Sequence, residues 1–303
     1  IGDFRNYSYN QTSWQSVIAN SELFVAFGGV PLKNGQIGQG GVGRHIQRES
    51  LLAAHQNGVK FVSVSPLKTD MADEVQAEWL TIRPNTDTAF MIALCYELLD
   101  KQLYDQQFLH RYTVGFDKFA DYLRGVDDGV AKTADWAAPI CDVPAARLRD
   151  LAMQMATHRT MLSLSWSLTR QAHGEQPFWA GVVLAAMLGQ IGLPGGGFGF
   201  GYAATNTVGN NFLRNMPIAD LPQGRNQISS FIPVARIADM LETPGAAFAY
   251  NGKTYHYPDI KMIYWAGGNP FHHHQDLRRF RRAWPKPDTL ILPDLCWNAS
   301  FKH

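Results

Sequence analysis

The chain has 303 residues, of which 46% are hydrophobic and 17% charged, and its formal net charge is +1. This is the composition of an ordinary globular protein, long enough to bury a large core and to form more than one lobe. The near-neutral charge gives no reason to expect nucleic acid or an anionic membrane as a partner. No apolar run reaches the roughly 18 residues of a membrane-spanning helix. The three cysteines are scattered without a CxxC pair, which argues against a zinc or iron–sulfur site and against a disulfide framework.

The first third of the chain alternates strands with helices. We expect strands at 22–27, 59–64 and 80–83, and helices at 47–56 and 87–99. Asn85 and Thr86 are well placed to cap the last of these helices. Strands that alternate with helices at this spacing predict a doubly wound, mostly parallel sheet, in a Rossmann-like αβα sandwich of the α/β class.

The remainder of the chain is more helical and then returns to an α/β pattern. Residues 102–158 are helical with breaks at 112–115 and 139–144, a strand is expected at 160–165, and an apolar helix at 176–190. The glycine-rich stretch 195–201 is expected to end that helix and to allow close backbone packing. Residues 202–231 have little periodicity, which is typical of an irregular excursion or a linker between lobes. The later elements expected are helices at 234–241 and 275–283 and strands at 261–265 and 289–292.

Polar and charged side chains follow five of these predicted elements. The loops concerned begin at Gly28, Ser65, Pro84, Trp166 and Asn269. In a doubly wound sheet the carboxyl ends of the strands gather along one edge, where ligands bind. Together the loops supply lysine and arginine for phosphates, aspartate and asparagine for a base or ribose, and a tryptophan for stacking. The pattern suits a large, doubly anionic ligand that carries nucleotides.

Each of these side chains also has a purely structural interpretation. Lys33 and Lys68, taken singly, are better explained as solvated loop charges, and Asp87 is as well suited to capping its helix as to binding a ligand. Trp166 is also compatible with a core position. The histidines at 272–274 are better suited to hydrogen bonding than to metal binding, because adjacent histidines cannot all face one ion.

No sequence pattern of a complete reactive centre is present. The chain has no Ser-His-Asp order, no HExxH, no Walker sequence and no carboxylate pair of catalytic spacing. A nicotinamide-dependent dehydrogenase would need GxGxxG directly after a strand, and the candidate at 38–43 lies well past the strand at 22–27. The chain is therefore interpreted as a cofactor holder without its reactive centre.

Several short motifs, in this order, resemble the dimethyl sulfoxide reductase family of molybdopterin oxidoreductases. They are IRPNTDTA at 82–89, WSLTR at 166–170, HGEQ at 173–176, MLGQIGLPGGGFG at 187–199, IPVARI at 232–237 and GGNPFHHHQD at 267–276. Within that family the chain is most similar to the branch of trimethylamine N-oxide, dimethyl sulfoxide and biotin sulfoxide reductases. The likeness runs across nearly all of the chain.

The resemblance implies molybdenum held by two molybdopterin guanine dinucleotides, in an oxotransferase that reduces an N-oxide or an S-oxide. The chain would contribute guanine-dinucleotide binding and part of the substrate funnel. It implies a dinucleotide-binding α/β domain over 1–228 and the C-terminal half of a second α/β domain over 229–303. Neither end of the chain reads as a natural terminus, so we expect a fragment of a longer protein. The alternative from another functional class is a non-catalytic nucleotide-binding module.

The family's metal ligand, a serine in this branch, would lie upstream of Ile1, and much of the pterin-binding barrel downstream of His303. No catalytic residue or metal ligand is therefore expected in this chain, and the chain alone should be inactive. The implied partners are the rest of the parent polypeptide, a small oxide substrate and an electron donor such as a c-type cytochrome. The implied compartment is the periplasm or the cytoplasm, with the periplasm favoured.

Twelve residues match dinucleotide-contacting positions of the family's motifs. They are Lys33, Asn34, Ser65, Asn85, Thr86, Asp87, Trp166, Ser167, Arg170, Asn269, His273 and Asp294. The chain departs from the family pattern at two places. Ser65 stands where the branch usually has aspartate, and Val30 stands where asparagine or aspartate is common. We therefore expect altered contacts to one of the two guanosines.

Overall fold

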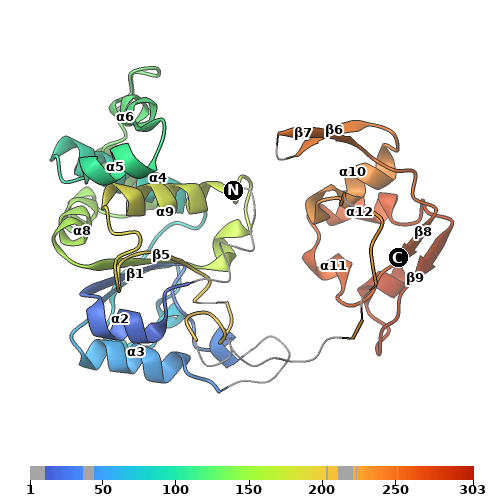
Figure 1. Ribbon diagram of the computed structural model, residues 1–303, viewed down its shortest axis with the longest axis horizontal. Coiled ribbons are helices and arrows are strands. Elements are labelled where there is room, and N and C mark those ends of the chain that lie inside the picture. The colour runs from blue at the N-terminus through green and yellow to red at the C-terminus, as the bar shows by residue number, and fades with distance from the viewer. Residues whose placement is uncertain are drawn as a thin grey trace. The chain divides into compact units, whose positions relative to one another are not determined.

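The computed structural model describes residues 11–36, 44–202, 204–210, 221–222, 224–228, 230–250 and 252–303. The chain forms two compact units, Ile1–Pro217 and Ile218–His303, shown in Figure 1. The domain boundary after residue 228 that the resemblance implies stays a prediction. The glycine-rich candidate at 38–43 lies outside the described residues.

Unit 1 is built on a five-stranded parallel sheet. Its strands are β1 (Leu23–Phe27), β2 (Lys60–Val64), β3 (Glu78–Leu80), β4 (Thr160–Leu164) and β5 (Gly197–Phe200), in the order β3-β2-β1-β4-β5. The chain winds outward in one direction from β1 to β3 and returns to the other side of β1 with β4. This confirms the doubly wound sheet expected from the sequence, and the strand order changes direction between β1 and β4.

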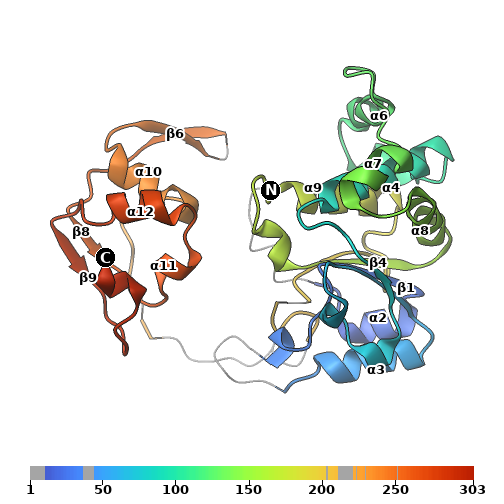
Figure 2. The same ribbon diagram turned by 180° about the vertical axis from the view of Figure 1, so that it is seen from behind.

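Helices cover both faces of this sheet, as Figures 1 and 2 show. One face is covered by α2 (Trp14–Asn20) and α3 (Gln47–Gln56). The other face is covered by α4 (Asp87–Asp100), α7 (Ala134–Cys141), α8 (Ala145–Thr157) and α9 (Gln176–Met187), with α5 (Gln106–Tyr112) and α6 (Phe116–Arg124) packed beyond them. Successive residues of a strand face opposite layers, so Val25 joins the core under α4 while Phe24 and Ala26 join the core under α2.

The glycine-rich stretch at 195–201 forms a strand, contrary to its interpretation as a helix end. Residues Gly197–Phe200 pair in parallel with β4 at the edge of the sheet. An ideal Cβ on Gly199 would lie 2.2 Å from the Tyr202 ring and 2.5 Å from Met161. Glycine has a low strand propensity, but here close packing against Tyr202 selects it.

Further differences from the prediction concern a strand end, a helix break and a helix cap. The short strand ends at Leu80 rather than continuing to residue 83, because the Arg83 N–H donates instead to the Cys141 carbonyl at 2.8 Å. The break expected at 139–144 is narrower, since α7 continues through Pro139 to Cys141. Thr86 is the N-cap residue of α4, but its hydroxyl donates to the Arg83 carbonyl at 2.7 Å rather than capping the helix.

Unit 2 combines a hairpin with a two-stranded parallel sheet. The hairpin pairs β6 (Ala247–Tyr250) with β7 (Lys253–His256), and the parallel pair is β8 (Met262–Tyr264) with β9 (Thr289–Ile291). The helices are α10 (Ile237–Glu242), α11 (Pro270–His273) and α12 (Leu277–Ala283). The hairpin is absent from the sequence prediction, and the helix expected at 275–283 begins later because the Asp276 carboxylate caps α12 through the Arg279 N–H.

The three cysteines lie in different environments. Cys95 in α4 and Cys141 at the end of α7 are buried, and Cys296 in unit 2 is exposed. Burial raises the pKa of the Cys95 thiol far above its usual range and raises the pKa of Cys141 to about 11. Within the described residues, no helix is long and apolar enough to cross a membrane.

The packing of β5 generates a stability prediction. The substitution Gly199→Ala should lower the free energy of unfolding of unit 1 by about 1–3 kcal/mol, because the added methyl group overpacks against the buried Tyr202 ring. Urea unfolding followed by circular dichroism measures this. Val114→Ala is the control, because Val114 is 99% exposed. Equal stability of both variants would contradict the packing assigned to β5.

Candidate functional site

The carboxyl ends of the strands in unit 1 lie level with one another. In the pairing register Phe27 lies opposite Val64 on one side and Leu164 on the other, Val64 pairs with Leu80, and Leu164 pairs with Phe200. The residues that follow these positions therefore share one edge of the sheet. This edge is where open α/β sheets bind ligands, in the crevice at the point where strand order reverses.

At the point where the strand order reverses, the segments that follow β1 and β4 approach each other closely. Gly28 has a φ of +80°, and an ideal Cβ there would lie 2.7 Å from the Ser165 Cβ and 3.0 Å from the Ser167 Oγ. The Ser167 Oγ donates to the Ser165 Oγ at 3.0 Å. Glycine at 28 is required by both the backbone conformation and the contact. The arrangement leaves small polar groups, rather than bulky side chains, at the centre of the edge.

The indole of Trp166 lies between the ends of β4 and β5. Its ring stacks on Phe200 with centroids 5.5 Å apart, and an ideal Cβ on Gly201 would lie 2.4 Å from its Nε1 atom. The Nε1–H is buried and has no acceptor among the residues that the structure describes. A buried donor without a partner costs about 1–3 kcal/mol, and a ligand acceptor at this edge would offset that cost. The Trp284 indole N–H in the core of unit 2 is unpaired in the same way. The ring of Trp166 thus packs in the core, as the structural interpretation of this residue expected, while its N–H stays unpaired.

Asp87 begins α4 just beyond β3 and is 3% exposed. Burial raises the pKa of its carboxyl from 3.8 to about 6, opposed by a hydrogen bond from its own backbone N–H. The positive end of the α4 dipole also favours the ionised form. The carboxylate is therefore available as an acceptor at neutral pH, held in a site with little water around it.

The loop after β2 folds back over the loop after β1. Ser65 is fully buried, and its Oγ donates to the Asp70 Oδ2 at 2.6 Å. The Asp70 carbonyl accepts from the Val30 N–H at 2.7 Å, and an ideal Cβ on Gly29 would lie 2.4 Å from that same carbonyl. Asp70 was not among the residues singled out from the sequence. The signal that could have found it is an acidic residue six positions after the end of β2.

Positive side chains occupy three loops of the same edge. Lys33 follows β1, Lys68 follows β2 and Arg170 follows β4, and all three are exposed. None of them has a carboxylate within 4.0 Å in the described part of the chain. Three cations without carboxylate partners suit an anionic ligand such as a diphosphate.

Two further predicted residues complete the edge in unit 1. Asn34 begins a short 3-10 helix, and its N–H donates to the Pro31 carbonyl at 3.2 Å. Asn85 is exposed with a φ of +68°, a left-handed conformation that asparagine tolerates better than most residues. Gln47 supports the first of these loops, since its Nε2 donates to the carbonyls of Val30 and Pro31.

The three predicted residues of unit 2 follow its two parallel strands. Asn269 lies after β8 and accepts from the Ser300 Oγ at 2.7 Å, while Asp294 lies after β9 and accepts from the Asn298 Nδ2 at 2.6 Å. Both are thus anchored to the same short segment of chain. His273 is exposed at the end of α11. Its neighbour His274 has a structural role, because its ring stacks on Phe280 with centroids 4.1 Å apart.

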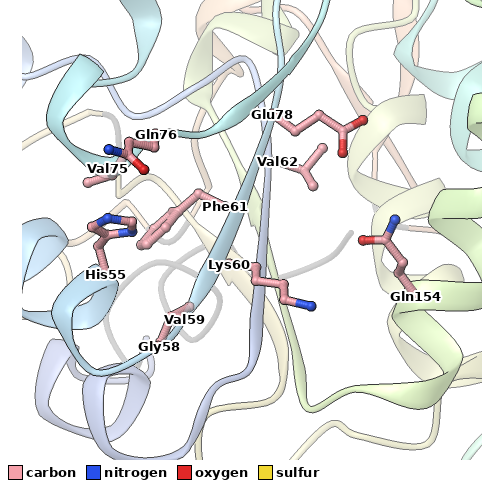
Figure 3. A pocket seen from close by; sticks show the side chains of 10 residues that line it. All are labelled: His55, Gly58, Val59, Lys60, Phe61, Val62, Val75, Gln76, Glu78 and Gln154. Atoms are coloured by element: carbon pink, nitrogen blue, oxygen red, sulfur yellow. The ribbon is translucent and has the colours of Figure 1, made fainter.

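A separate hollow of about 330 Å³ lies at the start of β2, beside residues such as His55, Lys60, Gln76 and Gln154 (Figure 3). None of the predicted site residues lines it. No group of three or more His, Cys, Asp or Glu side chains capable of holding a metal ion is found among the described residues. The predicted residues of unit 1 lie on loops at the carboxyl edge of the sheet, away from this hollow.

Comparison with known proteins gives a consistent result. The family model described as molybdopterin oxidoreductase matches residues 2–303. The biotin sulfoxide reductase of Cereibacter sphaeroides is 45% identical over 100% of this chain and 41% of its own length. The dimethyl sulfoxide/trimethylamine N-oxide reductase of the same organism is 41% identical over 97% of the chain and 37% of its own length. The trimethylamine-N-oxide reductase of Haemophilus influenzae is 39% identical over 96% and 36% respectively.

Among solved structures, the acetylene hydratase from Pelobacter acetylenicus matches with a TM-score of 0.47 and 25% identity, over 60% of this chain and 23% of that one. The chain spans about two fifths of the length of the curated relatives that it matches.

The buried carboxyl of Asp87 generates a pH prediction. The pKa of the Asp87 carboxyl is 3.8 in the unfolded chain and about 6 in the folded chain. The folded state therefore binds more protons between these two pH values. The free energy of unfolding should therefore fall as the pH rises from 4 to 7, by up to about 3 kcal/mol from this group. Asp87→Asn should remove this loss and be the more stable form at pH 7, as urea unfolding at both pH values would show.

Asp117→Asn is the matched control, because Asp117 also lies in the first turn of a helix but is exposed. If the stability difference between Asp87→Asn and the unsubstituted chain were the same at pH 4 and pH 7, the raised pKa of Asp87 would be wrong.

Proposed function

The chain belongs to the molybdopterin oxidoreductase family, and on this premise we propose that unit 1 binds the nucleotide end of a molybdopterin guanine dinucleotide. The observation that carries the proposal is the unpaired Trp166 Nε1–H, buried at the carboxyl edge of a doubly wound sheet. Family membership implies a molybdenum–molybdopterin cofactor, and the guanine dinucleotide form is the part that we propose.

The loops at this edge pack closely around the point where open α/β sheets bind ligands. Gly28, Gly29 and Gly201 each lack a side chain where a Cβ would collide with a neighbour at 2.7 Å or less. These glycines therefore let the neighbouring loops pack closely together at the point where the strand order reverses. Ser167, beside Gly28, is exposed and can be reached by a ligand at this edge.

The residues fit the group in charge. A guanine base offers N–H donors that a carboxylate can accept, and Asp87 supplies a buried carboxylate. The diphosphate is anionic, and Lys33, Lys68 and Arg170 provide cations without carboxylate partners. The Trp166 indole N–H donates to a ligand oxygen or nitrogen while its ring remains packed on Phe200. Asn34, Asn85 and Thr86 contribute amide and hydroxyl groups to the same edge.

For the parent protein we propose reduction of an N-oxide or an S-oxide, as the names of the reductases that match this chain describe for themselves. The bound molybdenum cofactor would supply oxygen-atom transfer, and this chain would bind and orient its nucleotide part. The stand-alone nucleotide-binding module is less favoured, because the match to these reductases extends along the chain. An electron donor such as a c-type cytochrome and a periplasmic location belong to the proposal for the parent.

Unit 2 is proposed to be part of a second α/β lobe that carries Asn269, His273 and Asp294. Parallel sheets are normally covered on both faces. In β8 and β9 the inner residues Ile263 and Leu290 pack on the core of unit 2, whereas the outer face bears Met262, Tyr264 and Ile291, exposed by 58%, 64% and 39%. The relatives are more than twice as long as this chain, and we propose that the remainder of the parent covers this face.

The nucleotide site predicts binding of free GDP by this chain in preference to ADP. Trp166→Phe should lower the affinity for GDP about fivefold to tenfold, because it removes one hydrogen-bond donor and keeps the aromatic ring. Isothermal titration calorimetry measures both. Trp297→Phe is the control, since Trp297 is 72% exposed in unit 2. Equal affinities for GDP and ADP, or no loss on Trp166→Phe, would count against the site.

The outer face of β8 and β9 predicts a difference between the chain and its parent. Tyr264→Glu should change the stability of the 303-residue chain by less than about 0.5 kcal/mol, because the side chain is exposed. In the parent it should destabilise by about 2 kcal/mol or more, because a carboxylate would be buried without a partner. Urea unfolding of both proteins, with Val114→Glu as control, tests this. A neutral effect in the parent would show that the face is not covered.

A further inference from the structure

We propose that Asp70 is the carboxylate that binds the ribose hydroxyls of the nucleotide, held in place by Ser65. The inference rests on the nucleotide site proposed above and assigns it a residue outside the twelve that the sequence suggested. Asp70 lies at the end of a short 3-10 helix (Lys68–Asp70) in the loop that follows β2.

The position of Asp70 is fixed by contacts on two sides. Its carbonyl accepts from the Val30 N–H at 2.7 Å, which ties it to the loop after β1. Its Oδ2 accepts from the Ser65 Oγ at 2.6 Å, which ties it to the end of β2. Gly29 makes room for it, because an ideal Cβ there would lie 2.6 Å from the Asp70 Cβ. The carboxylate is thereby brought to the ends of two neighbouring parallel strands.

This position has a known chemical use in doubly wound sheets. An acidic residue at the end of the second strand accepts hydrogen bonds from ribose hydroxyls, while the phosphates lie near the first turn. The end of β2 in this chain carries Ser65, whose hydroxyl cannot supply a negative charge. The fold-back of the loop places the Asp70 carboxylate against Ser65 and so supplies the charge from five residues further along the chain.

The carboxylate retains capacity for a ligand. An ionised carboxylate has two oxygens with about four acceptor sites, and the Ser65 hydroxyl engages Oδ2. Among the described residues, no Lys, Arg or His nitrogen lies within 4.0 Å of Asp70. Asp70 is half-buried, so part of the residue remains reachable from solvent. Hydroxyl donors of a ribose suit its carboxylate, and charge assistance strengthens such bonds.

A purely structural role for Asp70 predicts a different result from ribose binding. The contact to Val30 uses the backbone carbonyl, so Asp70→Asn keeps it. The asparagine side-chain oxygen also still accepts from the Ser65 hydroxyl. This substitution therefore removes the charge with little change to the loop, and it isolates the interaction of the carboxylate with a ligand.

The test compares GDP with 2′,3′-dideoxy-GDP, which lacks the ribose hydroxyls, by isothermal titration calorimetry on the 303-residue chain. Asp70→Asn should weaken GDP binding about tenfold or more and leave dideoxy-GDP binding unchanged within about twofold. Ser65→Ala should weaken GDP binding by a smaller factor with the same selectivity, because it releases the carboxylate from its position. Asp73→Asn is the control, since Asp73 is an exposed carboxylate three residues away.

The outcomes separate this inference from the function on which it rests. If the unsubstituted chain binds neither nucleotide, the nucleotide site and the role of Asp70 are both wrong. If it binds GDP and Asp70→Asn binds GDP equally well, only the role of Asp70 is wrong. An equal loss for GDP and dideoxy-GDP would assign Asp70 a structural role and overturn the inference. Circular dichroism and urea unfolding of each variant establish that the loss is not one of folding.

Discussion

The close approach of β1 and β4 at Gly28 and Ser165 shapes the centre of the carboxyl edge of unit 1. A side chain at Gly28 would collide with Ser165, and the in-register pairing of the strands places the other loops level with this point. Bulky groups are therefore excluded from the centre of the edge and polar ones surround it. The site is a consequence of sheet register as much as of the residues on its loops.

The electrostatics of the edge follow from unequal burial. Its cations are exposed and lack carboxylate partners, whereas its carboxylates, Asp87 and Asp70, are buried or half-buried. In the proposed nucleotide site, the phosphates would meet the cations, and the hydrogen-bond donors of base and sugar would meet the carboxylates. Inorganic phosphate alone would meet only the cations.

The sequence predicted the sheet and most helices because β1, β2 and β4 are short apolar runs between glycines and helical patterns. It missed β5, because glycine has a low strand propensity and this strand is stabilised by tertiary packing against Tyr202. Lys33, Asp87, Trp166 and Arg170 lie on loops at the carboxyl edge, where strand-end reasoning put them, and their contact with a nucleotide stays a prediction. Asp70 was missed because a carboxylate reaches Ser65 by a loop that folds back, and no periodic pattern encodes such a contact. Ser65 and Val30 are the two positions at which the chain departs from the family pattern, and both form a hydrogen bond with Asp70.

The thiols of the chain differ in reactivity as a result of where the helices bury them. Cys95 and Cys141 are enclosed in unit 1 with raised pKa values, so neither forms much thiolate at neutral pH. Cys296 is exposed and belongs to unit 2. A maleimide dye should therefore attach to unit 2 at this one native position and report on that unit separately, with no cysteine to be engineered in or out.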